Sequence, residues 1–166
     1  PLQMTRLYAL IANGGKLVTP HIASDVELTG NDGRPVRVLR RFGAQSPQPT
    51  GVDPTALTYV QRGLEEATHS ALGTSSGVFG QFPIDIAGKT GSAEKTVQVR
   101  GYPAGLNLTQ SWWCGYGPSD STPTLVVCAV IENGGHGGTA AAPAALKVFE
   151  SYFGKKAASQ TYVPTD

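Results

Sequence analysis

The chain is 166 residues long and almost neutral, which limits what it can be. Apolar residues make up 40% of it, charged residues only 15%, and the formal net charge is +1. A chain of this length can bury a core as one domain, and so small a net charge gives no electrostatic basis for binding nucleic acid. No apolar run approaches the roughly 20 residues of a membrane-spanning helix. We therefore expect one globular domain that has no nucleic-acid partner.

The first third of the chain predicts a helix, a hairpin and a connecting loop. Apolar side chains at helical spacing mark the helix, namely Met4, Leu7, Tyr8 and Ile11. Asn13-Gly14-Gly15 ends that pattern. Asn31-Asp32-Gly33 separates two apolar-rich segments, 26–28 and 36–39, and therefore indicates a β-hairpin. Residues 44–51 include two prolines and are typical of a loop.

A second helix is predicted from position 54. Asp53 is a good N-cap residue and Pro54 suits the first helical position. Gly73 follows the last residue of the periodic pattern and ends the helix. The expected buried stripe consists of Leu57, Val60, Leu64, Ala67 and Ala71.

The second half of the chain predicts three strands and a final helix. We expect strands over 84–92, 111–117 and 124–132, with a polar loop over 94–109 and a turn at 119–122. A glycine-rich loop over 133–138 then leads into a helix that starts near Thr139 and Pro143. Its buried stripe is Leu146, Phe149 and Phe153. These elements indicate an α+β fold, in which helices flank an antiparallel sheet, over residues 1–153, with a polar tail over 154–166.

The two cysteines, Cys114 and Cys128, fall opposite each other if the turn between their strands is centred near Ser121. Cross-strand partners have Cβ atoms about 4.5–5.5 Å apart, which exceeds the mean spacing in disulfides. We therefore favour two buried free thiols, and a disulfide is the alternative.

Lys89-Thr90-Gly91-Ser92 has the clearest chemical meaning. On a strand, Thr90 and Ser92 point to one side and Lys89 and Gly91 to the other. Two hydroxyl groups on one side can both donate to a ligand carboxylate. Gly91 has no side chain, so an extended ligand can lie against the strand. Lys89 adds a positive charge that favours an anionic substrate and can tune a neighbouring hydroxyl network.

The order of segments around this motif resembles the C-terminal half of the transpeptidase domain of class B penicillin-binding proteins of the elongation type, which are similar to penicillin-binding protein 2. Residues 82–88 precede the motif, and Ala93-Glu94 follows it. Trp112-Trp113-Cys114-Gly115-Tyr116-Gly117-Pro118, the apolar run 125–131 and Glu132-Asn133-Gly134-Gly135 come next. The resemblance implies the C-terminal part of a β-lactamase/transpeptidase-like fold, without a cofactor or metal.

The resemblance also assigns roles to individual residues. In this family the serine of a Ser-x-x-Lys motif attacks the peptide carbonyl, a Ser-x-Asn motif assists proton movement, and the Lys-Thr-Gly strand completes the pocket. By this correspondence Lys89 and Ser92 are catalytic, Thr90, Gly91 and Ser92 bind substrate, and the Ser92 backbone N–H joins the oxyanion hole. Glu94 matches the family pattern too, and we expect it to be structural. The implied activity is that of a D,D-transpeptidase that cross-links peptidoglycan stem peptides through an acyl-serine and is inhibited by β-lactams.

The sequence departs from the family pattern because it has no Ser-x-Asn, and its Ser-x-x-Lys match, Ser92 to Lys95, overlaps the strand motif. We therefore expect the nucleophile on a missing N-terminal half, present as a separate or nicked chain. The resemblance implies three further partners: peptidoglycan stem peptides, β-lactam antibiotics and a membrane glycan polymerase. It also implies a location on the extracytoplasmic face of the bacterial envelope, anchored by an N-terminal membrane segment that this chain does not contain.

Several alternatives remain open. A β-lactam sensor, a β-lactamase-like hydrolase and a non-catalytic structural domain share parts of the pattern. The G-x-S-x-G match at 73–77 follows a helix instead of a strand, which argues against a nucleophile elbow. Pro83 stands where a phosphate loop needs its first glycine. The histidines, His21, His69 and His136, lack metal-ligand spacing, and we interpret His136 as a loop residue near the sheet edge.

Overall fold

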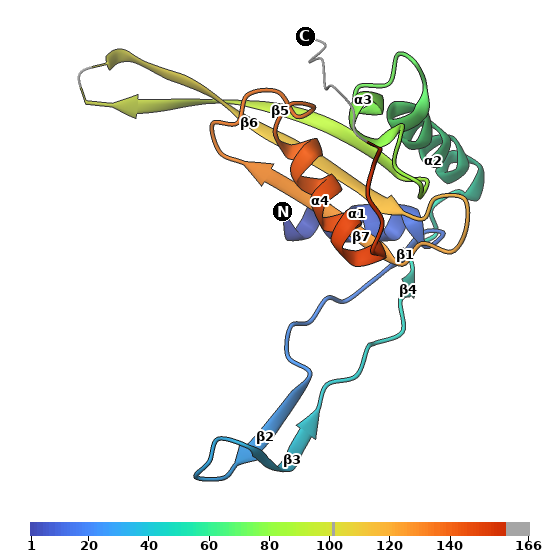
Figure 1. The fold of residues 1–166 in the computed structure, drawn as a ribbon, viewed down its shortest axis with the longest axis vertical. Coiled ribbons are helices and arrows are strands. Elements are labelled where there is room, and N and C mark those ends of the chain that lie inside the picture. The colour runs from blue at the N-terminus through green and yellow to red at the C-terminus, as the bar shows by residue number, and fades with distance from the viewer. Residues whose placement is uncertain (101, 159–166) are drawn as a thin grey trace.

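The computed structural model describes residues 1–100 and 102–158, and the side chains of all of these except 98–99 and 102–107. Most of the expected polar tail therefore lies outside the described residues. The centre of the fold is an antiparallel sheet with the strand order β5 (Ala87–Val99), β6 (Tyr102–Gly117) and β7 (Leu125–Ile131). Helix α4 (Ala141–Phe153) covers one face and α1 (Leu2–Ala12) lies against the other (Figure 1). This arrangement confirms the predicted α+β fold.

Each face of the sheet has its own hydrophobic core. Trp113 lies in the core under α4, where its ring stacks on Phe79 of α3 (Ser76–Phe79) with centroids 4.5 Å apart. Cys114 lies in the other core, together with Tyr8 of α1 and Leu64 of α2 (Pro54–His69). Neighbouring residues of a strand face opposite sides, so β6 supplies side chains to both cores. The sheet is therefore packed on both faces next to the Lys89 motif.

The predicted hairpin forms an arm that projects from the body (Figure 1). It consists of β2 (Asp25–Thr29) and β3 (Pro35–Arg41), in which every side chain is exposed. Gly33 has φ +75° in the connecting turn, a conformation that suits glycine. The short strands β1 (Lys16–Leu17) and β4 (Gln48–Pro49) pair at the base of the arm.

Helix α2 begins as predicted, but its buried stripe differs. The Asp53 carboxylate caps the helix by accepting from the backbone N–H groups of Thr55 and Ala56, at 2.7 and 3.1 Å. Val60 is 46% exposed, whereas Thr68 is fully buried. The hydroxyl of Thr68 donates to the Ile86 carbonyl just before β5. A hydrogen bond to the sheet therefore takes the place of an apolar contact on this face of the helix.

The prediction of a polar loop over 94–109 is wrong. Strand β5 continues to Val99, and β6 pairs with it through Glu94↔Thr109 and Lys95↔Leu108. Residues 93–96 are exposed, so their polar character reflects solvent on a two-stranded ribbon, and it does not mark an end of the strand. Strand β5 also begins at Ala87, later than expected. Within the described residues, none of the helices has the length and apolar character needed to cross a bilayer.

Candidate active site

The Lys89–Ser92 motif lies on β5, the strand at one edge of the sheet. Within the motif, β5 pairs with β6 from Lys89↔Cys114 to Ser92↔Ser111. No other strand of the described chain pairs with β5. An edge strand without a second partner offers backbone groups to an extended peptide ligand. The motif is thus placed where a peptide can lie alongside it.

Two cavities border the motif. Thr90 and Ser92 line a cavity of about 510 Å³ together with residues 71–78 and the turn 136–139. All four motif residues, 89–92, line a second, more apolar cavity of about 340 Å³, together with Met4, Tyr8 and Trp112. Lys89 and Gly91 are not among the residues that line the first cavity. Strand β5 is regular through the motif, so Thr90 and Ser92 share one side of it, as strand geometry requires.

The Lys89 ammonium nevertheless reaches the threonine side of the strand. Its Nζ donates to Thr90 Oγ1 at 2.9 Å, to Thr74 Oγ1 at 3.0 Å and to the Thr90 carbonyl at 3.3 Å. Partial burial lowers the pKa of Lys89 from its ordinary 10.5, because desolvation disfavours the charged form. The cleft thus holds a positive charge that has lost part of its hydration.

The two hydroxyl groups of the motif differ in their partners. Thr90 Oγ1 shares a hydrogen bond of 3.0 Å with Thr74 Oγ1. Ser92 Oγ accepts from the backbone N–H of Gly137 at 3.3 Å. The Ser92 hydroxyl proton therefore remains available to a ligand, and the Thr74–Thr90 pair retains one such proton whichever hydroxyl donates. The predicted pair of donors on one side of the strand is geometrically possible.

Thr74 was not identified from the sequence. It belongs to the G-x-S-x-G match, which indicated only a loop, and it precedes Lys89 by 15 residues. Gly73 lies so close to α2 that a Cβ there would come within 2.7 Å of the carbonyl oxygens of Glu66 and Ala67. The glycine at position 73 was the only sign available in the sequence, because glycine can mark a close approach of two backbones.

Buried hydrogen bonds hold the residue after Thr74. The backbone N–H of Ser75 donates to the Ala67 carbonyl at 3.0 Å, and its hydroxyl donates to the same carbonyl at 3.2 Å. The indole N–H of Trp113 donates to Ser75 Oγ at 3.3 Å. Because Ser75 and Trp113 are both buried, Thr74 is held between anchored neighbours.

The glycine-rich turn after β7 is fixed directly to the motif. A Cβ on Gly137 would come within 2.6 and 2.8 Å of the carbonyl oxygen and nitrogen of Gly91. Ser111 Oγ donates to the His136 carbonyl at 2.9 Å and accepts from the Ala141 N–H at 3.0 Å. The turn therefore packs against the backbone of the motif. The exposed His136 side chain lies at the edge of the larger cavity.

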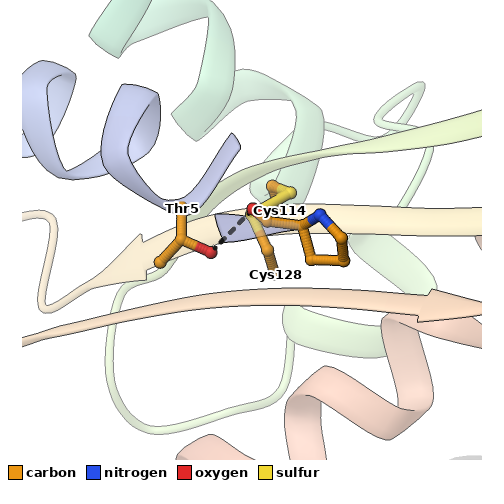
Figure 2. Close-up of a disulfide and its surroundings, with 4 residues drawn as sticks. Thr5, Cys114 and Cys128 are labelled. Atoms are coloured by element: carbon orange, nitrogen blue, oxygen red, sulfur yellow. Dashed lines mark hydrogen bonds between the residues drawn. A yellow bond between two sulfur atoms is a disulfide. The ribbon is translucent and has the colours of Figure 1, made fainter. Parts of the chain in front are cut away.

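Cys114 and Cys128 form a disulfide, so the expectation of free thiols is wrong. The two residues are paired across β6 and β7 with their Cα atoms 4.1 Å apart. This Cα separation is below the roughly 4.5 Å of a typical close cross-strand pair, so the average Cβ spacing on which the expectation relied does not apply to this pair. Figure 2 shows the disulfide beside α1, near Thr5. The bond ties the two strands together behind the motif, because Cys114 is also the β6 partner of Lys89.

Comparison with known proteins identifies the family. Residues 1–150 match the family model of the penicillin-binding protein transpeptidase domain. This chain belongs to that family. It is 29% identical over 164 residues to the peptidoglycan D,D-transpeptidase MrdA of Haemophilus influenzae, an alignment that covers 94% of this chain and 24% of the relative.

Solved structures agree with the family match. The D,D-transpeptidase domain of a peptidoglycan glycosyltransferase from Eggerthella lenta is 31% identical, with a TM-score of 0.63 over 92% of this chain and 32% of that one. PBP2 of Pseudomonas aeruginosa, solved with WCK 5153, is 27% identical, with a TM-score of 0.64 over 92% and 30% of the two chains. These matches confirm the resemblance to penicillin-binding protein 2. The chain spans about a quarter of the length of the curated relatives it matches.

Proposed function

We propose that this chain is the C-terminal part of a D,D-transpeptidase that cross-links peptidoglycan stem peptides through an acyl-serine. The observation that carries this proposal is that Lys89, Thr90 and Ser92 line one groove, at a strand edge that no other strand of the described chain pairs with, within a transpeptidase family. The attacking serine comes from a segment outside these residues.

In this proposal each motif residue has a distinct task. The ammonium of Lys89 attracts the carboxylate at the end of a stem peptide, and the hydroxyls of Thr90 and Ser92 donate to it. Gly91 lets the peptide lie against β5 as an added strand. The backbone N–H of Ser92 stabilises the oxyanion, and losing one such donor costs about 2.7–4 kcal/mol of transition-state stabilisation. A β-lactam has a comparable carboxylate and acylates the same serine.

Exposed apolar side chains support the presence of a further segment. Leu2 and Leu7 of α1 are 62% and 46% exposed, and Tyr59 of α2 is 72% exposed. A missing N-terminal half would cover these helices and bring the nucleophile to Lys89. The remaining proposed partner is a membrane glycan polymerase. The proposed location is the extracytoplasmic face of the bacterial envelope, with an N-terminal anchor.

Intact-mass analysis of the complete protein with and without penicillin tests this function. We expect a stoichiometric penicillin adduct on a serine that precedes residue 1, slow loss of that adduct, and cross-linking of D-Ala-D-Ala stem peptides. Rapid loss of the adduct would instead indicate a β-lactamase, and a stable adduct without cross-linking a sensor. Absence of any adduct would refute the proposal.

A matched pair of lysine variants tests the role of the motif. Lys89→Ala should reduce the acylation rate strongly because it removes the charge in the cleft. Lys95→Ala, also on β5, removes an exposed lysine whose side chain lies near Glu132, and it should acylate like the unmodified protein. Equal rates for the two variants would exclude a role for Lys89.

A further inference from the structure

The hydroxyl of Thr74 connects the two polar side chains that begin the motif. Thr74 Oγ1 accepts from Lys89 Nζ at 3.0 Å and shares a hydrogen bond of 3.0 Å with Thr90 Oγ1. Lys89 also donates directly to Thr90 Oγ1 at 2.9 Å. The three atoms therefore form a closed triangle of hydrogen bonds beside the larger cavity, which Thr74 and Thr90 line.

Oxygen atoms of threonines supply the polar contacts to the Lys89 ammonium in the described chain. Among the residues that the structure describes, no aspartate or glutamate lines either cavity beside the motif. Apart from Lys89, the titratable side chains that do are Tyr8 on α1 and His136 on the turn. Lys89 bonds to Thr74 and Thr90, and desolvation already lowers its pKa. Hydroxyl oxygens that accept from an ammonium stabilise its charged form. Loss of one of these acceptors therefore destabilises the charged form of Lys89.

We propose that Thr74 is a positioning residue of the transpeptidase site, which orients the Lys89 ammonium and the Thr90 hydroxyl toward the substrate carboxylate. This inference rests on the proposed function. Lysine has a flexible stem, and its Cβ lies on the opposite side of β5 from Thr90, so the strand alone does not fix the ammonium. Thr74 supplies the missing fixed point because Gly73 and Ser75 hold it against α2.

Three variants of the complete protein test the role of Thr74. Thr74→Val removes the hydroxyl with little change in shape, and Thr74→Ser keeps the hydroxyl. Thr58→Val is the matched control, because the Thr58 hydroxyl donates only to the Pro54 carbonyl on the exposed face of α2. The measurements are the acylation rate with a fluorescent penicillin between pH 6 and pH 10, and the pKa of Lys89 from NMR of ε-¹³C-lysine-labelled protein. Lys89→Arg assigns the resonance.

We expect Thr74→Val to acylate about 10- to 100-fold more slowly, the range for losing a hydrogen bond to a charged group. Its Lys89 pKa and the alkaline limb of its rate profile should both move to lower pH, because the ammonium loses an acceptor. Thr74→Ser and Thr58→Val should match the unmodified protein in both measurements.

The two measurements separate this inference from the proposed function. If the unmodified protein is not acylated, the proposed function fails, and the NMR titration still tests the contact between Thr74 and Lys89. An unchanged Lys89 pKa in Thr74→Val would overturn the positioning role. So would a Thr74→Ser variant that behaves like Thr74→Val, because the effect would then not come from the hydroxyl.

Discussion

Gly137 offers a direct test of how the glycine-rich turn supports the motif. An alanine Cβ at this position would come within 2.6 Å of the Gly91 carbonyl oxygen and 2.8 Å of the Gly91 nitrogen. Both are backbone atoms of a paired strand, so no side-chain rotation relieves the overlap. In Gly137→Ala the turn must move away from β5, and the hydrogen bond from the Gly137 N–H to Ser92 Oγ is lost.

The magnitude follows from these two effects. Overpacking a tight site costs about 1–3 kcal/mol, and a neutral hydrogen bond contributes about 0.5–1.5 kcal/mol. We therefore expect Gly137→Ala to lower the free energy of unfolding by about 2–4 kcal/mol. The acylation rate should fall as well, because the Ser92 side chain loses its fixed partner and the cavity beside Thr90 changes shape.

Urea unfolding of the complete protein, followed by tryptophan fluorescence, measures the first effect, and fluorescent penicillin measures the second. Gly63→Ala is the control, since a Cβ at this position in α2 meets nothing within 4 Å. That variant should be as stable as the unmodified protein, or more stable by up to about 1 kcal/mol through helix propensity. If Gly137→Ala unfolds at the same urea concentration and acylates at the same rate as Gly63→Ala, the turn does not support the motif.

Three further predictions concern the scaffold. The denatured, unreduced protein should show no titratable thiol from Cys114 or Cys128, and two would disprove the disulfide. Asp53→Ala should lower the unfolding midpoint near neutral pH, whereas Asp53→Asn keeps an acceptor and should lower it less. Backbone N–H donors lower the pKa of Asp53 in the folded state. The loss of stability in Asp53→Ala should therefore be fully present above the pKa of Asp53 in the unfolded state, and it should vanish as pH falls through the pKa in the folded state. Trp113→Phe should cost about 1–3 kcal/mol in urea unfolding because it leaves the buried Ser75 without its indole donor, and a loss no greater than that of Trp112→Phe would contradict this.

The sequence predicts most of the fold because the relevant signals are local. Asp53 and Pro54 identify the start of α2 through capping chemistry that involves only the next few residues. Asn31-Asp32-Gly33 similarly defines a hairpin without reference to the rest of the molecule. The alternation within Lys89–Ser92 also holds, because a strand imposes it on every residue. Composition is less informative for residues 94–109, whose polar side chains reflect exposure on a ribbon.

The features that the sequence does not reveal are contacts between distant segments. The pairing of Cys114 with Cys128 depends on a local strand separation of 4.1 Å between Cα atoms, which an average spacing cannot supply. The approach of Gly137 to Gly91 depends on how the turn after β7 packs on the strand two places away in the sheet. Predicting either contact requires the three-dimensional arrangement, although the residue types involved are visible in the sequence.

Lys89 shows why the site, more than the fold, requires coordinates. Strand alternation correctly separates its Cβ from the Thr90 side chain, and this rule alone predicts that the two groups act on different faces. The ammonium, however, is four carbons from the backbone and is bonded to Thr90 Oγ1 and Thr74 Oγ1. Where a long side chain ends depends on the acceptors within its reach. Here one acceptor, Thr74 Oγ1, lies in a loop that a buried tryptophan holds through Ser75. The chemistry of the motif therefore depends on residues outside it.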